Sequence, residues 1–369
     1  MTPFRPLRNS LNRITSRSQE PLAHQRRPQL KQHDVLVSRF PAQAISLDMI
    51  YLNHMAVNRL ALDDPGVDVG AKAAAGIIAL RACDGSFPNP PPPPFIGGTG
   101  PGVWRPTPGT TAMAVSWLGT VTPFTLTRPS QFRAEPPPAL NSREYTRNYY
   151  EVKNLGALNN SDRTPQQTDL AHFWFANYTV LVNRTLRDIA SARVDNIADS
   201  SRLFALADMA IADALITAWN DKVFYNFWRP ITAIREGDND DNSRTAVDPL
   251  WESLYAAPPY PDYTSGANNT IGALTKALEL FFGRDRMNFS VTTTNTGPTI
   301  EDTRTYRRFS DAAEEVVDAR IYAGIHFRFA DTAARKQGRQ VARWIFKNFL
   351  RPLDEIDKHD HDDHDKHHH

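Results

Sequence analysis

Residues 201–229 read SRLFALADMAIADALITAWNDKVFYNFWR, and this stretch decides the fold class because it is apolar almost all round. A run of this kind and length is typical of a buried helix. Lys222 and Arg229 lie seven residues apart, nearly two turns, so one helix over 201–229 would place both cations on one face. Pro230 would end that helix. Because buried cations need anionic partners, the stretch predicts an anion-binding site inside a helical protein.

The two cations differ in a way that suits a tetrahedral anion. The guanidinium of Arg229 is a planar fork that can hold two oxygens, and the ammonium of Lys222 is a compact charge for a third. Taken alone, a Lys/Arg pair at this spacing is more often a solvated surface face. The apolar residues around this pair favour the binding interpretation.

A second motif, Thr264-Ser265-Gly266-Ala267, follows the turn-like run PPYPDY and precedes an apolar-periodic stretch that ends at Gly283. Ser265 and Gly266 are therefore expected at the start of a helix. Free backbone N–H groups and the helix dipole favour an anion there, and glycine permits its close approach. Ser265 could equally cap the helix, which is the commoner use of such a serine and is compatible with anion binding.

A third motif, Ala319-Arg320-x5-His326, lies in a run that predicts a helix over 310–329. Six residues separate Arg320 from His326, so the two side chains do not share a helical stripe and would approach a ligand from different directions. Taken alone, a histidine with apolar neighbours is more often a packed core residue. The three motifs together, in this order, favour one oxyanion site over three unrelated structural roles.

In their order and spacing these motifs resemble a known signature: Lys-x6-Arg-Pro, then Pro-Ser-Gly-His, then Ser-Arg-x5-His. That signature is shared by the vanadium-dependent haloperoxidases and the type-2 phosphatidic acid phosphatase superfamily. The chain looks like a soluble bacterial haloperoxidase-like member. The resemblance covers about residues 34–353 and is most specific from residue 200 onward.

The resemblance implies that vanadate, or phosphate in the same place, is the bound group. It assigns His326 the central role: the matching histidine ligates vanadium in the haloperoxidases and attacks phosphorus in the phosphatases. Both roles need a neutral imidazole nitrogen, with the other nitrogen fixed by an acceptor that the sequence does not reveal. The residues implied to hold the oxygens of the anion are Lys222, Arg229, Ser265, Gly266 and Arg320.

Two positions depart from the family pattern. Ala267 stands where the pattern has its middle histidine, which serves as acid or base, and alanine cannot transfer a proton. The family commonly places an acid four residues after the last histidine, but here Ala330 occupies that position and Asp331 comes one later. Asp262 and His172 are the two candidates for a substitute proton donor.

The motifs and the resemblance favour a vanadate-dependent haloperoxidase, in which hydrogen peroxide drives the oxidation of a halide. An acid phosphatase that uses His326 as a phosphohistidine nucleophile, acting on a small phosphate ester, is the leading alternative. A third hypothesis is a phosphate or vanadate binder without turnover, because it accommodates Ala267 most simply. The halide, the organic substrate and the oligomeric state are left open.

The fold predicted from the patterning is all-α, a helical bundle with long irregular loops. No series of alternating strands is evident, and the run from 86 to 110 is too rich in proline and glycine for regular structure. Apolar periodicity or continuous apolar character predicts helices over 43–61, 70–83, 167–194, 201–229, 267–283, 310–329 and 331–350.

Charge and composition favour one soluble helical domain over 34–353, with its active-site half at 200–353. We expect a disordered basic arm over 1–33 and a disordered tail rich in His and Asp over 354–369. The net charge of +1 indicates no nucleic-acid partner, and a single cysteine excludes an intrachain disulfide. No signal peptide or membrane span is evident, which predicts a soluble and cytoplasmic protein.

Overall fold

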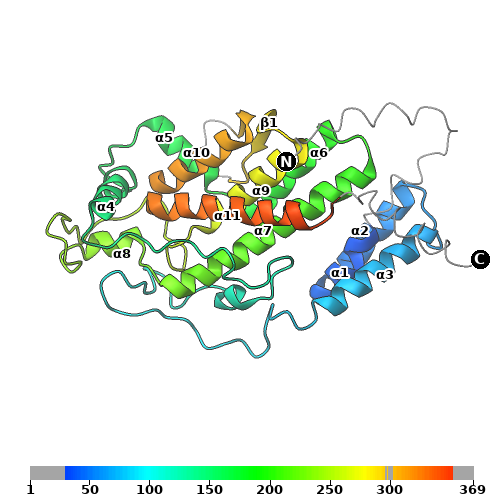
Figure 1. Cartoon of the computed structure of the whole chain (residues 1–369), viewed down its shortest axis with the longest axis horizontal. Helices are drawn as coiled ribbons and strands as arrows, with labels where there is room; N and C mark the ends of the chain where they lie inside the picture. Colours follow the sequence, from blue (N-terminus) through cyan, green and yellow to red (C-terminus); the bar gives the residue numbers. More distant parts are fainter. Residues whose placement is uncertain (1–29, 296, 298–301, 352–369) are drawn as a thin grey trace, which may run out of the picture.

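The computed structural model describes residues 30–295, 297 and 302–351, and most of its regular structure is helical (Figure 1). The predicted all-α helical-bundle class is therefore confirmed. The helices are α1 (Leu30–Arg39), η4 (Pro41–Gln43), α2 (Ala44–Val57), α3 (Pro65–Leu80), η5 (Ser116–Thr120), α4 (Arg143–Leu155), α5 (Pro165–Trp174), α6 (Tyr178–Arg193), α7 (Ile197–Tyr225), α8 (Pro230–Arg235), α9 (Gly266–Phe282), α10 (Phe309–Tyr322) and α11 (Arg328–Asn348).

The centre of the molecule is a bundle in which α9 packs against α7, α10 and α11 (Figure 1). The backbones of α9 and α11 come very close because glycines face the contact. A Cβ atom on Gly338 would lie 2.2 Å from the carbonyl oxygen of Asn269, and one on Gly272 would lie 2.6 Å from that of Arg335. No larger residue fits at either position. This close packing brings the start of α9 beside the start of α11, where the predicted motifs lie.

Helices α1, α2 and α3 pack on one another and lie together beside the main bundle (Figure 1). A long connection without helix or strand follows them, as predicted for 86–110, and it joins the bundle at an isolated bridge between Val103 and Phe227. Helix α1 begins at Leu30, inside the predicted 1–33 arm. Residues 1–29 and the tail 354–369 lie outside the described residues, and a single domain over 34–353 stays a prediction.

The prediction of one helix over 201–229 is wrong at its end. Helix α7 stops at Tyr225, and Asn226 adopts a left-handed conformation with φ 47° that asparagine tolerates better than most residues. The chain then pairs with the long connection, since the amide of Trp228 donates to the carbonyl oxygen of Gly102 at 2.9 Å. Arg229 therefore precedes α8 and does not share a helix with Lys222. Contacts distant in sequence override the local apolar pattern.

Two other predicted helices are interrupted. The run 167–194 divides into α5 and α6, because the side chain of Asn177 accepts a hydrogen bond from the amide of Val180 and starts a new helix there. The run 310–329 divides into α10 and α11, so His326 lies in the connection between two helices. A small antiparallel hairpin, β1 (Arg286–Thr292) and β2 (Thr303–Arg308), was not predicted.

The hydrophobic core helix α7 is long and apolar enough to cross a membrane, and no other helix in the described part of the chain meets that test. Helix α7 packs against α9, α11 and η5 inside the bundle. Such contacts are those of the core helix of a bundle, which passes the same test of length and composition.

The turn between α10 and α11 depends on Gly324. Its φ is +77°, and an added Cβ atom would lie 2.3 Å from the carbonyl oxygen of Gly156 and 2.7 Å from Cβ of Ser253. We expect Gly324→Ala to lower the free energy of unfolding by about 2–4 kcal/mol, since a left-handed conformation costs a non-glycine residue about 1–2 kcal/mol before any steric overlap. Urea unfolding measures this, and Gly283→Ala, also at positive φ but with nothing within 4 Å, isolates the steric part. Equal losses in both variants would contradict the predicted overlap.

Candidate active site

Lys222 lies in the last turn of α7 with its side chain fully buried. Its Nζ donates to the carbonyl oxygens of Pro261 and Asp262 at 2.6 and 3.2 Å, and it lies 4.8 Å from the centre of the Tyr260 ring. Burial, and then the charge of Arg229, holds the pKa of Lys222 well below its usual value. A buried anion beside Lys222 would offset the cost of its charge.

Arg229 reaches the same place from the start of α8 and is also fully buried. Its Nε donates to the carbonyl oxygen of Tyr260 at 2.8 Å and its Nη1 to that of Ile325 at 2.6 Å. The guanidinium thus joins two loops far apart in sequence. Its Nη2 has no hydrogen-bond partner among the described residues, although it is buried. A buried donor left in this state is costly unless a ligand satisfies it.

Arg320 comes from the last turn of α10 and is 6% exposed. Its Nη1 donates weakly to the carbonyl oxygen of Trp174 at 3.4 Å, and its guanidinium lies 5.7 Å from the centre of the Phe175 ring. The Nε of Arg320 also lacks a partner within the part of the chain that the structure describes. Arg229 and Arg320 therefore each present one unsatisfied donor.

His326 lies among these cations and is 2% exposed. Its Nε2 is 3.2 Å from Nη1 of Arg229, and its Nδ1 is 2.7 Å from Oδ1 of Asp262. Burial, followed by the charges of Arg229, Lys222 and Arg320, holds the pKa of His326 well below its usual value. The imidazole is therefore neutral at neutral pH, as both predicted roles require. The carboxylate of Asp262 therefore lies beside the second imidazole nitrogen, a neighbour that the sequence did not reveal.

Ser265 and Gly266 lie at the start of α9, as predicted. Ser265 does not cap the helix, because its side chain accepts no hydrogen bond from a backbone amide of the first turn; its Oγ accepts weakly from Nδ2 of Asn268 at 3.5 Å. A Cβ atom on Gly266 would lie 2.9 Å from the ring of Trp219, so packing against Trp219 is one reason for glycine here. The structure thus brings the three motifs together from α7, α8, α9 and α10.

Two buried carboxylates lie among the cations, which the sequence did not predict as a pair. Asp262 and Asp331 are both 0% exposed. Burial raises the pKa of Asp262 to about 7 although Arg229 and Lys222 oppose the shift, and burial raises the pKa of Asp331 well above its usual value. Asp331 Oδ1 accepts from Nδ2 of Asn268 at 2.8 Å. Asn268, in the first turn of α9, was missed because buried asparagines carry no motif.

The two suggested substitutes for the missing histidine differ in position. Ala267 itself is half-buried and packs against the core. Nδ1 of His172 lies 2.6 Å from the hydroxyl of Tyr255, and Tyr255 stacks on Phe175. Phe175 lies in turn 5.7 Å from the guanidinium of Arg320, so two aromatic rings connect His172 to the cations. Asp262 touches His326 directly, so it is the better placed of the two.

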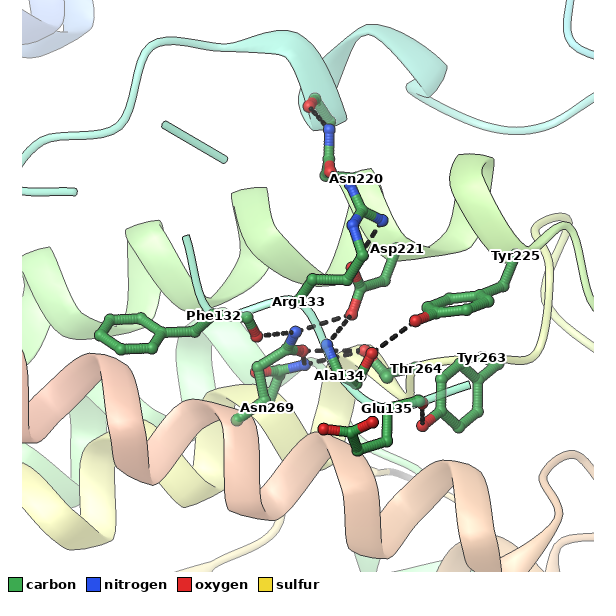
Figure 2. A network of polar contacts seen from close by, with 12 residues as sticks. Phe132, Arg133, Ala134, Glu135, Asn220, Asp221, Tyr225, Tyr263, Thr264 and Asn269 are labelled. Atoms are coloured by element: carbon green, nitrogen blue, oxygen red, sulfur yellow. Dashed lines mark hydrogen bonds and ion pairs between the residues drawn. The ribbon is translucent and has the colours of Figure 1, made fainter. Parts of the chain in front are cut away.

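A polar network holds the second motif against α7 and α11. Figure 2 shows Thr264 and Asn269 near Asp221 of α7, with Arg133 reaching Asp221 from the preceding loop. Gln337 of α11 connects these groups: its Oε1 accepts from Asn269 at 2.8 Å, and its Nε2 donates to Asp221 at 2.7 Å. The turn before Ser265 is thereby fixed in position.

Asp221 makes stability depend on pH. Burial raises its pKa to about 6 although Gln337 and Arg133 oppose the shift, whereas an unfolded aspartate titrates near 3.9. The stabilising contribution of the protonated group is fully present below the unfolded pKa and is lost as pH rises through about 6.

From pH 5 to pH 8, the free energy of unfolding of the wild type should fall by about 1 kcal/mol relative to that of Asp221→Asn, because asparagine does not titrate. Urea unfolding of both proteins at the two pH values measures the change. Asn220→Asp, one position earlier on α7, serves as a comparison that keeps Asp221. Parallel pH profiles of the wild type and Asp221→Asn would show that Asp221 does not titrate in this range.

The fold and the cluster of buried cations around a neutral histidine define a helical bundle with a candidate oxyanion site. The predicted resemblance to the superfamily that contains the vanadium-dependent haloperoxidases is supported by comparison with known proteins. Residues 202–355 match a sequence model described as the second helical-bundle domain of vanadium chloroperoxidase.

Among individual proteins, the chain is 27% identical over 286 residues to vanadium chloroperoxidase of Curvularia inaequalis, a match that covers 59% of this chain and 46% of that protein. The match thus spans about half the length of that relative. A solved bacterial vanadium-dependent iodoperoxidase superposes with a TM-score of 0.70 at 26% identity, covering 85% of this chain and 76% of the other. A bacterial vanadium-dependent chloroperoxidase in its holo form shares the fold with a TM-score of 0.70 at 18% identity, covering 86% and 80%.

The residues present fit a tetrahedral oxyanion such as vanadate. Nη2 of Arg229 and Nε of Arg320 are buried donors without partners among the described residues. Lys222 has three donor hydrogens and two carbonyl partners. The neutral nitrogen of His326 can serve as a ligand to a metal centre. Donors and ligand therefore have the chemistry that a bound vanadate needs.

Proposed function

We propose that the protein is a vanadate-dependent haloperoxidase that uses hydrogen peroxide to oxidise a halide. The observation that carries this proposal is the cluster of buried cations with unsatisfied donors around His326, in a fold shared with vanadium haloperoxidases. Vanadate bound there would activate hydrogen peroxide toward attack by a halide. Similarity to the vanadium haloperoxidases supports an enzyme of this type, and the use of peroxide and halide is part of the proposal.

In this proposal Lys222, Arg229 and Arg320 hold the oxygens of vanadate, and Ser265 and Gly266 add the start of α9. His326 is the ligand to vanadium. The cations do more than bind, because they also hold the pKa of His326 low and so keep its ring nitrogen available as a ligand. Buried positions strengthen each of these charge interactions relative to water.

The site lacks a histidine at position 267, so proton transfer falls to another group. Asp262 is the neighbouring acid in direct contact with the site, 2.7 Å from Nδ1 of His326. We expect turnover to be slow compared with an enzyme that carries the middle histidine, since positioned acid or base catalysis contributes about 100- to 10,000-fold.

An acid phosphatase is the second candidate, and one observation favours it. A neutral histidine whose second nitrogen lies beside a carboxylate is the arrangement of an activated nucleophile. His326 would attack the phosphorus of a small phosphate ester, and the same cations would hold the phosphate oxygens. The two candidate functions use one site and differ in the substrates supplied.

The deciding experiment is a paired assay on one purified sample freed of bound anions. Bromide and iodide oxidation is measured with orthovanadate and hydrogen peroxide, and hydrolysis of p-nitrophenyl phosphate is measured without vanadate. Halide oxidation that requires vanadate supports the haloperoxidase. Ester hydrolysis that vanadate inhibits, without halide oxidation, supports the phosphatase. Neither activity, together with anion-dependent thermal stabilisation, supports a binding protein.

We also propose that the protein is soluble. The apolar helix α7 is the core helix of the bundle, and it carries the buried polar groups Asp213, Asp221 and Lys222. A cytoplasmic location stays a prediction.

A further inference from the structure

The site contains more negative charge than a simple cradle for an anion needs. Three buried cations, Lys222, Arg229 and Arg320, share the site with two buried carboxylates, Asp262 and Asp331. The groups lie close enough to act on one another, because Asp262 and Asp331 both raise the pKa of Lys222 and of Arg229. Each ionised carboxylate repels a multiply charged anion. A simple anion site would therefore not contain these two carboxylates.

Asp331 makes no direct ion pair with the three cations. No ion pair within 4.0 Å links Asp331 to a cation in the part of the chain that the structure describes, and its Oδ1 accepts instead from Nδ2 of Asn268 at 2.8 Å. Its Oδ2 is buried and has no hydrogen-bond partner within 3.5 Å among those residues, although the side chain of Ser265 is near enough to lower the pKa of Asp331 against the larger effect of burial. When Asp331 is ionised, this unpaired oxygen is a strong acceptor that awaits a donor.

Asp262 adds a second acceptor on the side of His326. Its Oδ1 receives no hydrogen bond from the described residues, although it lies 2.7 Å from Nδ1 of His326 and 3.5 Å from Nη1 of Arg229. The site thus presents unsatisfied donors on Arg229 and Arg320 together with unsatisfied acceptors on the two aspartates. A ligand that satisfies all of them must both accept and donate hydrogen bonds.

We propose that Asp331, with Asp262 beside it, makes the site selective for tetrahedral oxyanions that carry their own O–H groups. Hydrogen phosphate and hydrogen vanadate have such groups near neutral pH, and each O–H can donate to a carboxylate oxygen. Sulfate has the same shape but no proton to donate. Its oxygens would face the carboxylate oxygens, and this repulsion would weaken sulfate binding. The inference rests on the proposed oxyanion site and adds its specificity.

The test compares phosphate and sulfate binding to the vanadate-free protein by isothermal titration calorimetry at pH 8. We expect the wild type to bind phosphate about 10- to 100-fold more tightly than sulfate, as one hydrogen bond to a charged group allows. In Asp331→Asn, the amide can donate to sulfate, so the affinities for phosphate and sulfate should differ by no more than about threefold. Asp262→Asn should lower the ratio in the same direction.

Binding elsewhere on the protein must be separated from binding at this site. An exposed basic groove with a volume of about 330 Å³ lies between α10 and α11 and is lined by Arg335, Lys336, Arg339 and Arg343. The double variant Lys336→Ala/Arg343→Ala should leave the phosphate-to-sulfate ratio unchanged. A ratio that falls in this double variant would assign the selectivity to the groove and overturn the proposal.

The outcomes distinguish this inference from the proposed function. Equal binding of phosphate and sulfate by the wild type would overturn the selectivity, while the oxyanion site would stand. If the wild type binds neither anion, the proposed oxyanion site is wrong, and so is the proposed function. An Asp331→Asn protein that melts cooperatively and keeps the wild-type ratio would also overturn the role of Asp331. Thermal melts of each variant confirm that it is folded.

Discussion

Replacement of His326 by alanine is expected to lower vanadate-dependent halide oxidation by at least about 100-fold. Loss of a residue that merely supports a metal ligand costs about 10- to 100-fold, and His326 is the proposed ligand itself. The residue is buried among three cations that keep its imidazole neutral, and no other described histidine contacts them. Steady-state bromide oxidation at saturating vanadate and peroxide measures the loss.

Two comparisons make the His326 result interpretable. Phosphate binding should persist in His326→Ala because the cations proposed to hold the oxygens are untouched, and such binding would show that the site is still formed. His172→Ala is the matched control, since His172 contacts Tyr255, which stacks on Phe175, and not His326 or the cations. Full activity in His326→Ala would exclude the assignment of the site. Equal losses in both variants would point to a general structural effect.

Introduction of histidine at position 267 is expected to raise turnover by about 100-fold or more. Acid or base catalysis by a positioned side chain contributes about 100- to 10,000-fold, and Ala267 provides none. Ala267 lies in the first turn of α9, directly after Ser265 and Gly266, and it is half-buried, so a larger side chain has a path toward solvent. The measurement is kcat for bromide oxidation as a function of pH.

The pH profile separates proton transfer from a change in shape. Ala267→His should add an ionisation near the pKa of histidine to the profile of kcat. Ala267→Gln has a similar size but cannot transfer a proton at these pH values, so it should leave kcat unchanged or lower it. An equal rise in kcat in the two variants would mean that packing limits the rate. No rise in a folded Ala267→His protein that binds vanadate would show that Asp262 already supplies the proton.

The candidate site also explains why the protein tolerates costly buried groups. Unsatisfied donors on Arg229 and Arg320 and unsatisfied acceptors on Asp262 and Asp331 each destabilise the folded chain when no ligand is present. A ligand that satisfies them stabilises the fold by mass action, about 2.7 kcal/mol at a concentration of 100 Kd. We therefore expect thermal stability to rise as the site is filled.

Several properties followed from the sequence alone. The apolar runs predicted an all-α bundle, because burial of continuous apolar stretches requires helices packed on one another. The three motifs predicted one anion site that includes Lys222, Arg229 and Arg320, because buried cations need anionic partners, and this site stays a proposal. The absence of a histidine at 267 was also visible, and no structure was needed to see that alanine cannot transfer a proton.

Only the tertiary structure decided how these groups meet. Arg229 does not share a helix with Lys222, because pairing of Trp228 with Gly102 ends α7 early. Asp331, one residue beyond the family position, lies in the first turn of α11, where it reaches Asn268 of α9. The pairing of Asp262 with His326 joins residues 64 positions apart. Local sequence specifies helices by periodicity, but the charges and hydrogen bonds of this site depend on contacts between segments that only the packed bundle brings together.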